Sequence, residues 1–286
     1  MTLVNLVLIA LVPLSNGILV DRTQYINIYF GGFLAQGALL GICFVLVNKG
    51  IWKLIFPSYE TLAQIFRYAF QAFVANLIFF LLCRIDYWFV EKYCSANDLG
   101  NYIQVSKLVQ MFIVIPAIMA SIIFPISAGG DKNSVRESIS LFSRMIIALY
   151  TLASLVFIAA GYWLFPFIYG STFTNMYIPY LLLIPGIFFL SMLTLLGAHF
   201  AGQNKVRLNI VYSAIGLVVI ITGDIILIPI YGIIAAAFVS SAGYFLCLVF
   251  LMRIFIQQNH LTLKDILILK QKDLVGIRTW FLQKRQ

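Results

Sequence analysis

The sequence predicts an all-α polytopic membrane protein with about eight transmembrane helices. Of its 286 residues, 62% are apolar and only 10% carry charge. The apolar residues form long runs, and a helix needs about 20 of them to cross a hydrocarbon layer about 30 Å thick. The runs lack the apolar–polar alternation of a transmembrane β-barrel. Because lipid cannot satisfy free backbone groups, helices are the remaining way to span the bilayer.

Eight runs have the length that a membrane-spanning helix requires. They cover Leu3 to Val20, Ile26 to Val47, Phe66 to Tyr93, Leu99 to Ile126, Ile139 to Tyr162, Met176 to Ala201, Leu208 to Ile228 and Ile230 to Ile254. The first run has no basic amino-terminal region and no small-residue cleavage site, so we interpret it as a retained helix and not as a signal peptide.

Two segments outside these runs have patterns of their own. Residues 51–65 are predicted to be a cytoplasmic interfacial linker, because Pro57 and Ser58 precede a helical period that leads into the third span. The tail, residues 255–286, contains a Thr262-x-x-Asp265 capping signal and mixes apolar with basic residues. We expect a basic amphipathic segment on the anionic inner leaflet, and a solvated disordered tail is the alternative.

The basic residues predict the orientation, since short cytoplasmic loops retain Lys and Arg. They gather after the second, fourth, sixth and eighth runs, for example at Lys49, Lys132, Lys205 and Lys264. Both termini are therefore expected in the cytoplasm. This topology accounts for most of the net charge of +9. Nucleic-acid binding is not expected, because no soluble segment is large enough to present a basic face.

The sequence gives no sign of a metal or cofactor. The four Cys residues lie in or beside apolar runs without C-x-x-C spacing, and His199 and His260 are isolated. No G-x-x-x-x-G-K-[ST] signature for ATP occurs either. We expect no cofactor and no enzymatic activity.

Four charged residues of the predicted spans are candidates for a charge at bilayer depth. Arg84 and Asp86 belong to the third, Lys107 to the fourth, and Asp224 to the outer end of the seventh, where we expect hydration. A charge at the bilayer centre costs at least about 2.5 kcal/mol, so each is a functional candidate. Arg84 and Asp86 point about 200° apart on a helix, so their partners must lie on other helices.

Counting residues predicts those partners. The third and fourth spans are expected to form an antiparallel hairpin that turns near Ala96 and Asn97. Asp86 then lies level with Lys107, roughly 15 Å from the turn at 1.5 Å per residue, and an ion pair between them is predicted. On the same count, Arg84 lies level with Gln110.

A polar stripe of about 80° follows the fourth span and contains Lys107, Gln110, Ala117 and Ser121. In one interpretation these groups hold helices together. In the other they line a water-filled cavity where Arg84 and Lys107 meet an anion and Asp86 carries a proton. The candidate substrate-binding residues are Arg84, Lys107, Gln110 and Asn76. The candidates for proton coupling or ion pairing are Asp86 and Asp224.

Three segments carry a resemblance to a known family. Residues 67–90 read RYAFQAFVANLIFFLLCRIDYWFV, and residues 98–127 read DLGNYIQVSKLVQMFIVIPAIMASIIFPIS. With IPIYGIIAAAFVSSAGY at 228–244, they resemble Wzx-type oligosaccharide flippases of the multidrug, oligosaccharidyl-lipid and polysaccharide exporter superfamily. The likeness covers about Arg67 to Arg253. The sequence departs from the family at Asp224, where Asn is usual, and at Ala235, where Gly is usual.

The resemblance implies two six-helix lobes around a central cavity. Residues 66–254 would form the six-helix carboxy-terminal lobe, and residues 1–50 two helices of an incomplete amino-terminal lobe. It implies a flippase that moves polyprenyl-diphosphate-linked oligosaccharides across the bacterial cytoplasmic (inner) membrane for surface polysaccharides such as O-antigen or capsule. The implied partners are this lipid-linked substrate, membrane lipids and polysaccharide polymerase machinery.

Two alternatives remain open at the level of sequence. The chain could be a truncated remnant that inserts without transporting, because a cavity between lobes needs both walls. It could also be a membrane-embedded transferase or polymerase acting on lipid-linked sugars, although its loops are too short to hold a donor substrate.

Overall fold

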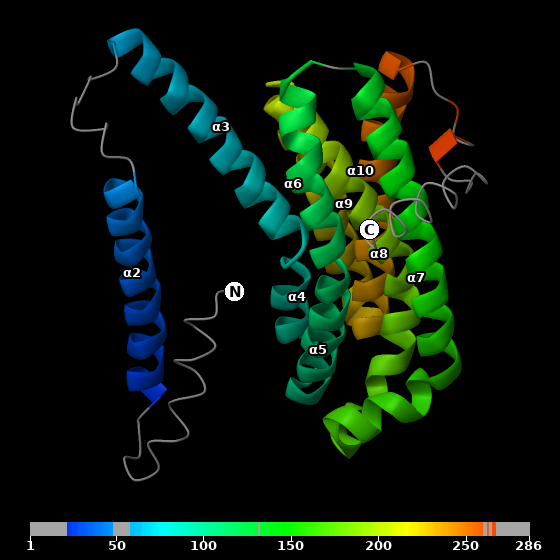
Figure 1. Ribbon diagram of the computed structural model, residues 1–286. Coiled ribbons are helices and arrows are strands. Elements are labelled where there is room, and N and C mark those ends of the chain that lie inside the picture. Colours follow the sequence, from blue (N-terminus) through cyan, green and yellow to red (C-terminus); the bar gives the residue numbers. More distant parts are fainter. Residues whose placement is uncertain (1–21, 48–57, 131, 260–261, 263–264, 267–286) are drawn as a thin grey trace, which may run out of the picture. The chain divides into compact units, whose positions relative to one another are not determined.

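The computed structural model describes residues 22–47, 58–130, 132–259, 262 and 265–266, and all regular structure in them is helical (Figure 1). The chain forms two compact units, Met1–Leu62 and Ala63–Gln286. The elements are α2 (Arg22–Val47), α3 (Tyr59–Leu82), α4 (Asp86–Tyr93), α5 (Ala96–Phe112), α6 (Val114–Ala128), α7 (Lys132–Tyr169), the 3₁₀ helix η1 (Ser171–Met176), α8 (Tyr177–Gly202), α9 (Val206–Tyr231) and α10 (Ile233–Asn259).

Six helical stretches of the described residues are long and apolar enough to cross a membrane, and they match the third to eighth predicted spans. They are Tyr59–Tyr93, Ala96–Ala128, Ser134–Tyr169, Ser171–Gly202, Val206–Tyr231 and Ile233–Asn259. The second predicted span is helical as α2, with Phe30–Leu46 as its apolar part. The first, Leu3 to Val20, lies outside the described residues. The prediction of an all-α, multi-pass membrane protein is confirmed.

The third span begins earlier than predicted and is interrupted. Ser58 accepts a hydrogen bond from the Thr61 backbone at 3.3 Å, and α3 then continues from Tyr59 to Leu82 without a turn after the predicted linker. Between α3 and α4 the backbone tightens, because the Arg84 N–H bonds to the Leu81 carbonyl at 3.0 Å and the Tyr87 N–H to the Arg84 carbonyl at 3.2 Å. Such i to i+3 bonds are those of a 3₁₀ turn.

The fourth span is also divided, at Ile113 between α5 and α6. Pro116 has no N–H to donate to the Phe112 carbonyl, and its ring crowds that carbonyl. The Tyr150 hydroxyl of α7 donates to the Phe112 carbonyl instead. A side chain from a neighbouring helix therefore compensates for the backbone bond that proline removes.

The predicted hairpin between the third and fourth spans is present. α4 ends at Tyr93, and α5 begins at Ala96. Ser95 caps α5, since its hydroxyl oxygen accepts from the Asp98 backbone at 3.1 Å and donates to the Asp98 carboxylate at 2.7 Å. At the turn between α9 and α10, Gly232 has φ +60° and ψ −141°, a backbone conformation that favours glycine.

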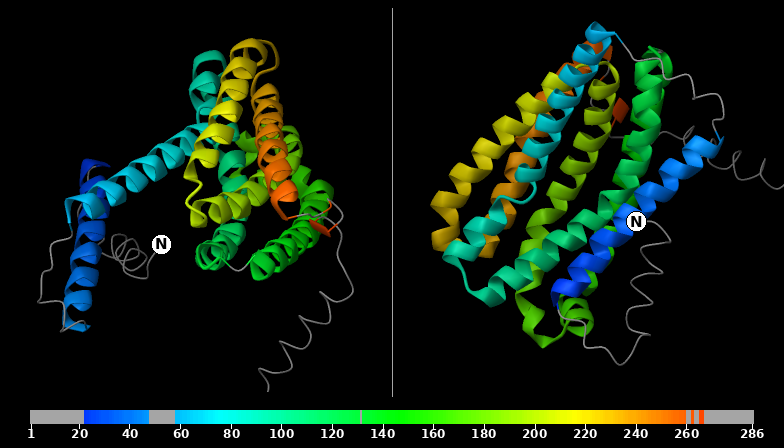
Figure 2. Two further views of the ribbon diagram at one scale, coloured as in Figure 1. Left: turned by 90° about the horizontal axis from the view of Figure 1, so that it is seen from above. Right: turned by 90° about the vertical axis from the view of Figure 1, so that its left-hand side faces the viewer.

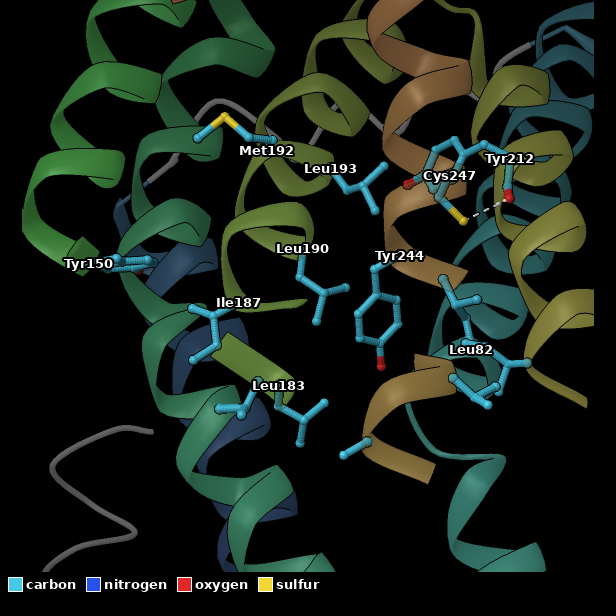
Figure 3. Close-up of a cluster of buried hydrophobic side chains, with 14 of the residues drawn as sticks. Leu82, Tyr150, Leu183, Ile187, Leu190, Met192, Leu193, Tyr212, Tyr244 and Cys247 are labelled. Carbon is cyan, nitrogen blue, oxygen red and sulfur yellow. Dashed lines mark hydrogen bonds between the residues drawn. The ribbon is translucent and has the colours of Figure 1, made fainter. Parts of the chain in front are cut away.

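The core of the larger unit lies around α8 and α10, which lie side by side with α9 packed against α10 (Figure 2). Its centre holds Leu190, Leu193, Tyr244 and Cys247, all buried (Figure 3). The Cys247 thiol donates to the Tyr212 carbonyl of α9 at 3.1 Å. Ser241 of α10 donates to the Leu182 carbonyl of α8 at 2.6 Å. Short polar side chains thus join helices within an apolar core, as is common in membranes.

The start of the tail contacts α7 within the larger unit. Asp265 accepts hydrogen bonds from the backbone and hydroxyl of Thr262 at 3.1 and 2.7 Å, which confirms the capping signal. Arg144 of α7 donates to the Asp265 carbonyl, and Ile266 is buried. The tail after Ile266 lies outside the described residues, so its placement on the inner leaflet stays a prediction.

Candidate functional site

Arg84 lies in the tight turn between α3 and α4, where its side chain meets two aromatic rings and an amide. Its guanidinium donates to Oε1 of Gln110 on α5 at 2.8 Å. The guanidinium carbon lies 5.6 Å from the centre of the Phe80 ring and 5.7 Å from that of Tyr87. Gln110 also donates to the Tyr87 hydroxyl at 3.4 Å. The predicted level of Arg84 with Gln110 is therefore confirmed.

The half-buried Arg84 makes no ion pair with a carboxylate of the described residues. Ring faces and an amide oxygen attract a guanidinium without neutralising its charge. At 1.5 Å per residue, Arg84 stands about 16 Å from the Ser95 turn, which is near the middle of a bilayer. A full positive charge is thus held at this depth by neutral groups.

Asp86 faces away from Arg84 into the bundle and is buried. Its carboxylate accepts hydrogen bonds from the Tyr102 hydroxyl of α5, from the Ser240 hydroxyl of α10 at 3.1 Å, and from the Tyr87 backbone at 3.0 Å. These three donors come from three helices. Asp86 therefore joins α4, α5 and α10.

The predicted ion pair between Asp86 and Lys107 does not form. Lys107 is exposed, whereas Asp86 meets Tyr102, which lies five residues earlier on α5 and so about 140° around the helix. The residue count gave a similar depth for the two charges, but it did not give the rotation of α5. The buried face of α5 carries Tyr102, Val105 and Val109, and Lys107 points elsewhere.

Asp224 also differs from expectation. The sequence places it near the outer end of its helix, where we expected hydration, but its exposed fraction is 0%. Neither carboxyl oxygen has a hydrogen-bond partner in the described part of the chain. The neighbouring Gly223 explains the burial, because a Cβ built there would lie 2.6 Å from Val239 of α10. The two helices thus approach closely beside Asp224.

The remaining candidates lie on surfaces that are not buried. Asn76 is exposed on α3, four residues before Phe80, which in turn precedes Arg84 by four residues. Residues four apart on a helix share one face, so Asn76 lies on the face that leads to Arg84. The predicted stripe of Lys107, Gln110, Ala117 and Ser121 contains no buried residue, although the break at Ile113 interrupts its helix.

Sequence reasoning missed the aromatic rings around Arg84 and the hydroxyl partners of Asp86. The rings had a signal, because Phe80, Arg84 and Tyr87 have the i, i+4, i+7 spacing of one helical face. No sequence pattern pointed to Tyr102 or Ser240 as partners of Asp86. Ser240, for example, lies 154 positions from Asp86. In the described residues, no group of three or more His, Cys, Asp or Glu side chains could hold a metal ion.

Comparison with known proteins identifies the family. A family model described as "Polysaccharide biosynthesis protein" matches residues 26–178, more than half of the chain. The chain belongs to this polysaccharide biosynthesis protein family. The matched segment of this polysaccharide biosynthesis protein runs from within α2 into the start of α8 and contains Asn76, Arg84, Asp86, Lys107 and Gln110. No curated protein and no solved structure matches the chain.

Family membership supports a role in polysaccharide biosynthesis, and the helical stretches identify a membrane protein. The geometry adds a chemical feature. The Arg84 guanidinium lies beside the Gln110 amide of α5, and the same helix carries the exposed ammonium of Lys107.

Proposed function

We propose that this chain is a flippase that moves polyprenyl-diphosphate-linked oligosaccharides across the bacterial cytoplasmic membrane for surface polysaccharide synthesis. Membership of the polysaccharide biosynthesis family supports this role. The six apolar helical stretches of the described residues also support this role, since such a substrate is itself anchored in the membrane by its lipid. In this proposal both termini face the cytoplasm, and the chain moves its substrate without chemical change.

The observation that carries the proposal is the state of Arg84. Burying a charge without pairing it is costly, so a guanidinium left with neutral partners at bilayer depth needs a functional reason. A diphosphate headgroup supplies that reason, because its oxygens match the planar donors of arginine. Gln110 positions the guanidinium at 2.8 Å while leaving its remaining donors for the phosphate.

Lys107 and Asn76 extend this headgroup site in the proposal. Lys107 lies three residues before Gln110 on α5, so the two side chains share a face of that helix. Asn76 lies two helical turns before Arg84 and offers an amide to sugar hydroxyls. The lipid tail of the substrate would remain in the bilayer beside these helices.

The two broken spans suggest how the site moves. α3–α4 breaks at Arg84, and α5–α6 breaks at Ile113, one turn beyond Gln110. Both breaks therefore lie at the depth of the Arg84–Gln110 hydrogen bond. In transporters, broken helices at mid-membrane serve binding and alternating access. We infer that the outer segment formed by α4 and α5 tilts about these breaks when the headgroup passes.

Reconstitution tests this function directly. The purified full chain would be placed in liposomes with a fluorescent polyprenyl-diphosphate oligosaccharide, and translocation followed by cleavage with an impermeant glycosidase. Arg84→Ala should slow translocation at least tenfold, since a charge-assisted hydrogen bond is worth about 1.5–3 kcal/mol. Arg84→Lys should restore part of the rate, because it returns the charge without the planar donors.

The matched control is Arg136→Ala, which removes an exposed arginine of α7 and should leave the rate unchanged. Wild-type translocation by Arg84→Ala would remove the headgroup role. A wild-type chain that folds and inserts but moves no substrate would indicate a non-transporting remnant. Extension of the sugar by a labelled donor in the same vesicles would indicate a transferase or polymerase.

A further inference from the structure

The turn between α7 and α8 is bonded to the start of α5. The 3₁₀ helix η1 forms this turn, and both lie at the lower end of the bundle in Figure 1. The buried Asn101 of α5 donates from its amide nitrogen to the Thr172 carbonyl of η1 at 3.1 Å. Asn175 of η1 donates to the Asp98 carboxylate of α5 at 3.3 Å. Two side-chain hydrogen bonds thus connect η1 with the first two turns of α5.

η1 itself is anchored to α7 and α8. Its last residue, Met176, is buried in the core of the bundle. The next residue, Tyr177, donates its hydroxyl hydrogen to the Ile158 carbonyl of α7 at 2.8 Å. The Tyr177 ring lies against Gly161 of α7, 3.3 Å from a Cβ built there. η1 therefore stays with α7 and α8 when another part of the bundle moves.

The start of α5 is the end of the α4–α5 segment that moves furthest when the segment tilts. Asp98 lies 15 positions before the break at Ile113, or about 22 Å along the helix axis. A tilt of about 10° away from η1 would move this end by about 4 Å at that length. Polar atoms now 3.1 and 3.3 Å apart would then lie well beyond hydrogen-bonding distance. The tilt therefore requires both bonds to η1 to open.

Both α5 side chains keep a partner within their own helix when these bonds open. The second oxygen of the Asp98 carboxylate accepts from the Ser95 hydroxyl at 2.7 Å, so the cap of α5 remains. The Asn101 amide nitrogen also donates to the Asn97 carbonyl at 2.8 Å. A donor or acceptor that keeps a partner does not bear the full cost of desolvation. Opening is therefore reversible and does not unwind the helix.

We propose that η1 is a latch that holds the start of α5 against α7 and α8 and releases it each time the α4–α5 segment tilts. The latch bonds are the Asn101–Thr172 and Asn175–Asp98 hydrogen bonds. The Asn175–Asp98 bond is exposed, so water can replace it at little cost. This role rests on the proposed function, because the tilt belongs to the transport cycle. The contact itself can be measured without substrate.

The test restrains the latch with a covalent bridge. In a full chain without its native cysteines, Asp98→Cys and Asn175→Cys would be joined by a short bifunctional thiol reagent that a reductant releases, in liposomes with the fluorescent polyprenyl-diphosphate oligosaccharide. The short bridge should slow translocation about tenfold or more, because a closed conformational step blocks turnover. Reduction should restore the rate of the unbridged chain. A long flexible bridge between the same two cysteines is the matched control and should leave most of the rate, since it permits the tilt.

A second measurement uses the same two cysteines in detergent without substrate. The rate at which the short reagent bridges them reports how much of the time η1 and α5 are in contact. Asn101→Ala removes the remaining latch bond and should lower this rate about threefold or more. The matched control is Asn259→Ala, which removes an asparagine that bonds only within α10 and should leave the bridging rate unchanged.

The outcomes separate the latch from the flippase role. Failure of the wild-type chain to move substrate would overturn the flippase proposal and, with it, this role of η1. Unchanged translocation through the short bridge would overturn the latch alone, because the segment would then work without leaving η1. Equal slowing by the short and long bridges would do the same, and so would a bridging rate that Asn101→Ala does not lower.

Discussion

At the scale of single residues, glycine decides how closely the last helices approach. A Cβ built on Gly216 of α9 would lie 2.2 Å from the Cys247 sulfur and 2.9 Å from Leu82, and one built on Gly243 of α10 would lie 2.5 Å from Ile220. These distances are shorter than real carbon contacts allow. Between apolar helices in lipid, such close approach supplies much of the association energy, because no hydrophobic gain remains within the membrane.

Gly216→Ala is therefore expected to destabilise the bundle. Overpacking a well-packed core costs about 1–3 kcal/mol, and both Cys247 and Leu82 would have to move. Unfolding in SDS titrations would measure the loss. Gly100→Ala is the control, since a Cβ at Gly100 of α5 meets nothing within 4 Å and should be neutral or slightly stabilising. Equal stabilities of the two variants would contradict this account of the α9–α10 contact.

At the scale of elements, the break between α5 and α6 is stabilised from outside its own helix. Pro116 leaves the Phe112 carbonyl without a backbone donor, and the Tyr150 hydroxyl of α7 provides one. The Tyr150 ring also packs edge to face with Phe112 at a centroid distance of 5.3 Å. Contacts from α7 thus stabilise the break in the neighbouring span. They hold it beside Gln110 and the proposed headgroup site.

A double-mutant cycle tests this arrangement. Tyr150→Phe alone should lower stability by about 1 kcal/mol, because it removes a donor and leaves a part-buried carbonyl unsatisfied. In a Pro116→Ala background the same change should cost little, since an alanine at this position can donate its own N–H to the Phe112 carbonyl. SDS unfolding of the four chains gives the coupling energy. Additive effects would show that Tyr150 does not replace the missing backbone bond.

At the scale of the whole molecule, the sequence predicted what depends on composition along the chain and missed what depends on rotation about helix axes. The spans follow from hydropathy, and the level of Arg84 with Gln110 follows from counting along a hairpin. The partner of Asp86 and the burial of Asp224 depend on which faces α5, α9 and α10 turn inward. Contacts between helices determine which faces turn inward, and the residue pattern of a single helix does not specify those contacts.

The helix break at Arg84 shows the same limit. No proline or glycine marks residues 83–85, and the 3₁₀ bonds there accompany a hydrogen bond that the Tyr87 backbone N–H donates to the Asp86 carboxylate. Hydropathy predicts a continuous segment because the residues are apolar on both sides of the break. The division of the chain into lobes at 1–50 and 66–254 also stays a prediction, and so does the orientation of both termini.

Cysteine labelling of intact bacteria tests that orientation across the whole molecule. In a chain without its native cysteines, an impermeant maleimide should label Tyr231→Cys at the proposed outer end of α9 and should not label Gln257→Cys near the end of α10 until the cells are permeabilised. Both positions are exposed, so accessibility reports the side of the membrane. The reverse pattern would place the termini outside.

The native cysteine Cys94 adds a pH dependence to the same assay. Burial, and then the nearby Asp98 carboxylate, raise the pKa of the Cys94 thiol at the proposed outer turn. The reactive species is the thiolate, so at pH 7 a chain whose only cysteine is Cys94 should react more slowly than one whose only cysteine is at position 231. Its labelling rate should keep rising at alkaline pH after the rate at position 231 has levelled off, because its thiolate forms at higher pH.

Asp98→Asn should shift the rise in the labelling rate of Cys94 to lower pH, because it removes the nearby carboxylate. The control is Glu60→Gln at the far end of α3, which should leave the pH profile of Cys94 unchanged. Equal profiles for the two cysteines in intact cells would contradict the half-buried setting of Cys94 between α4 and α5.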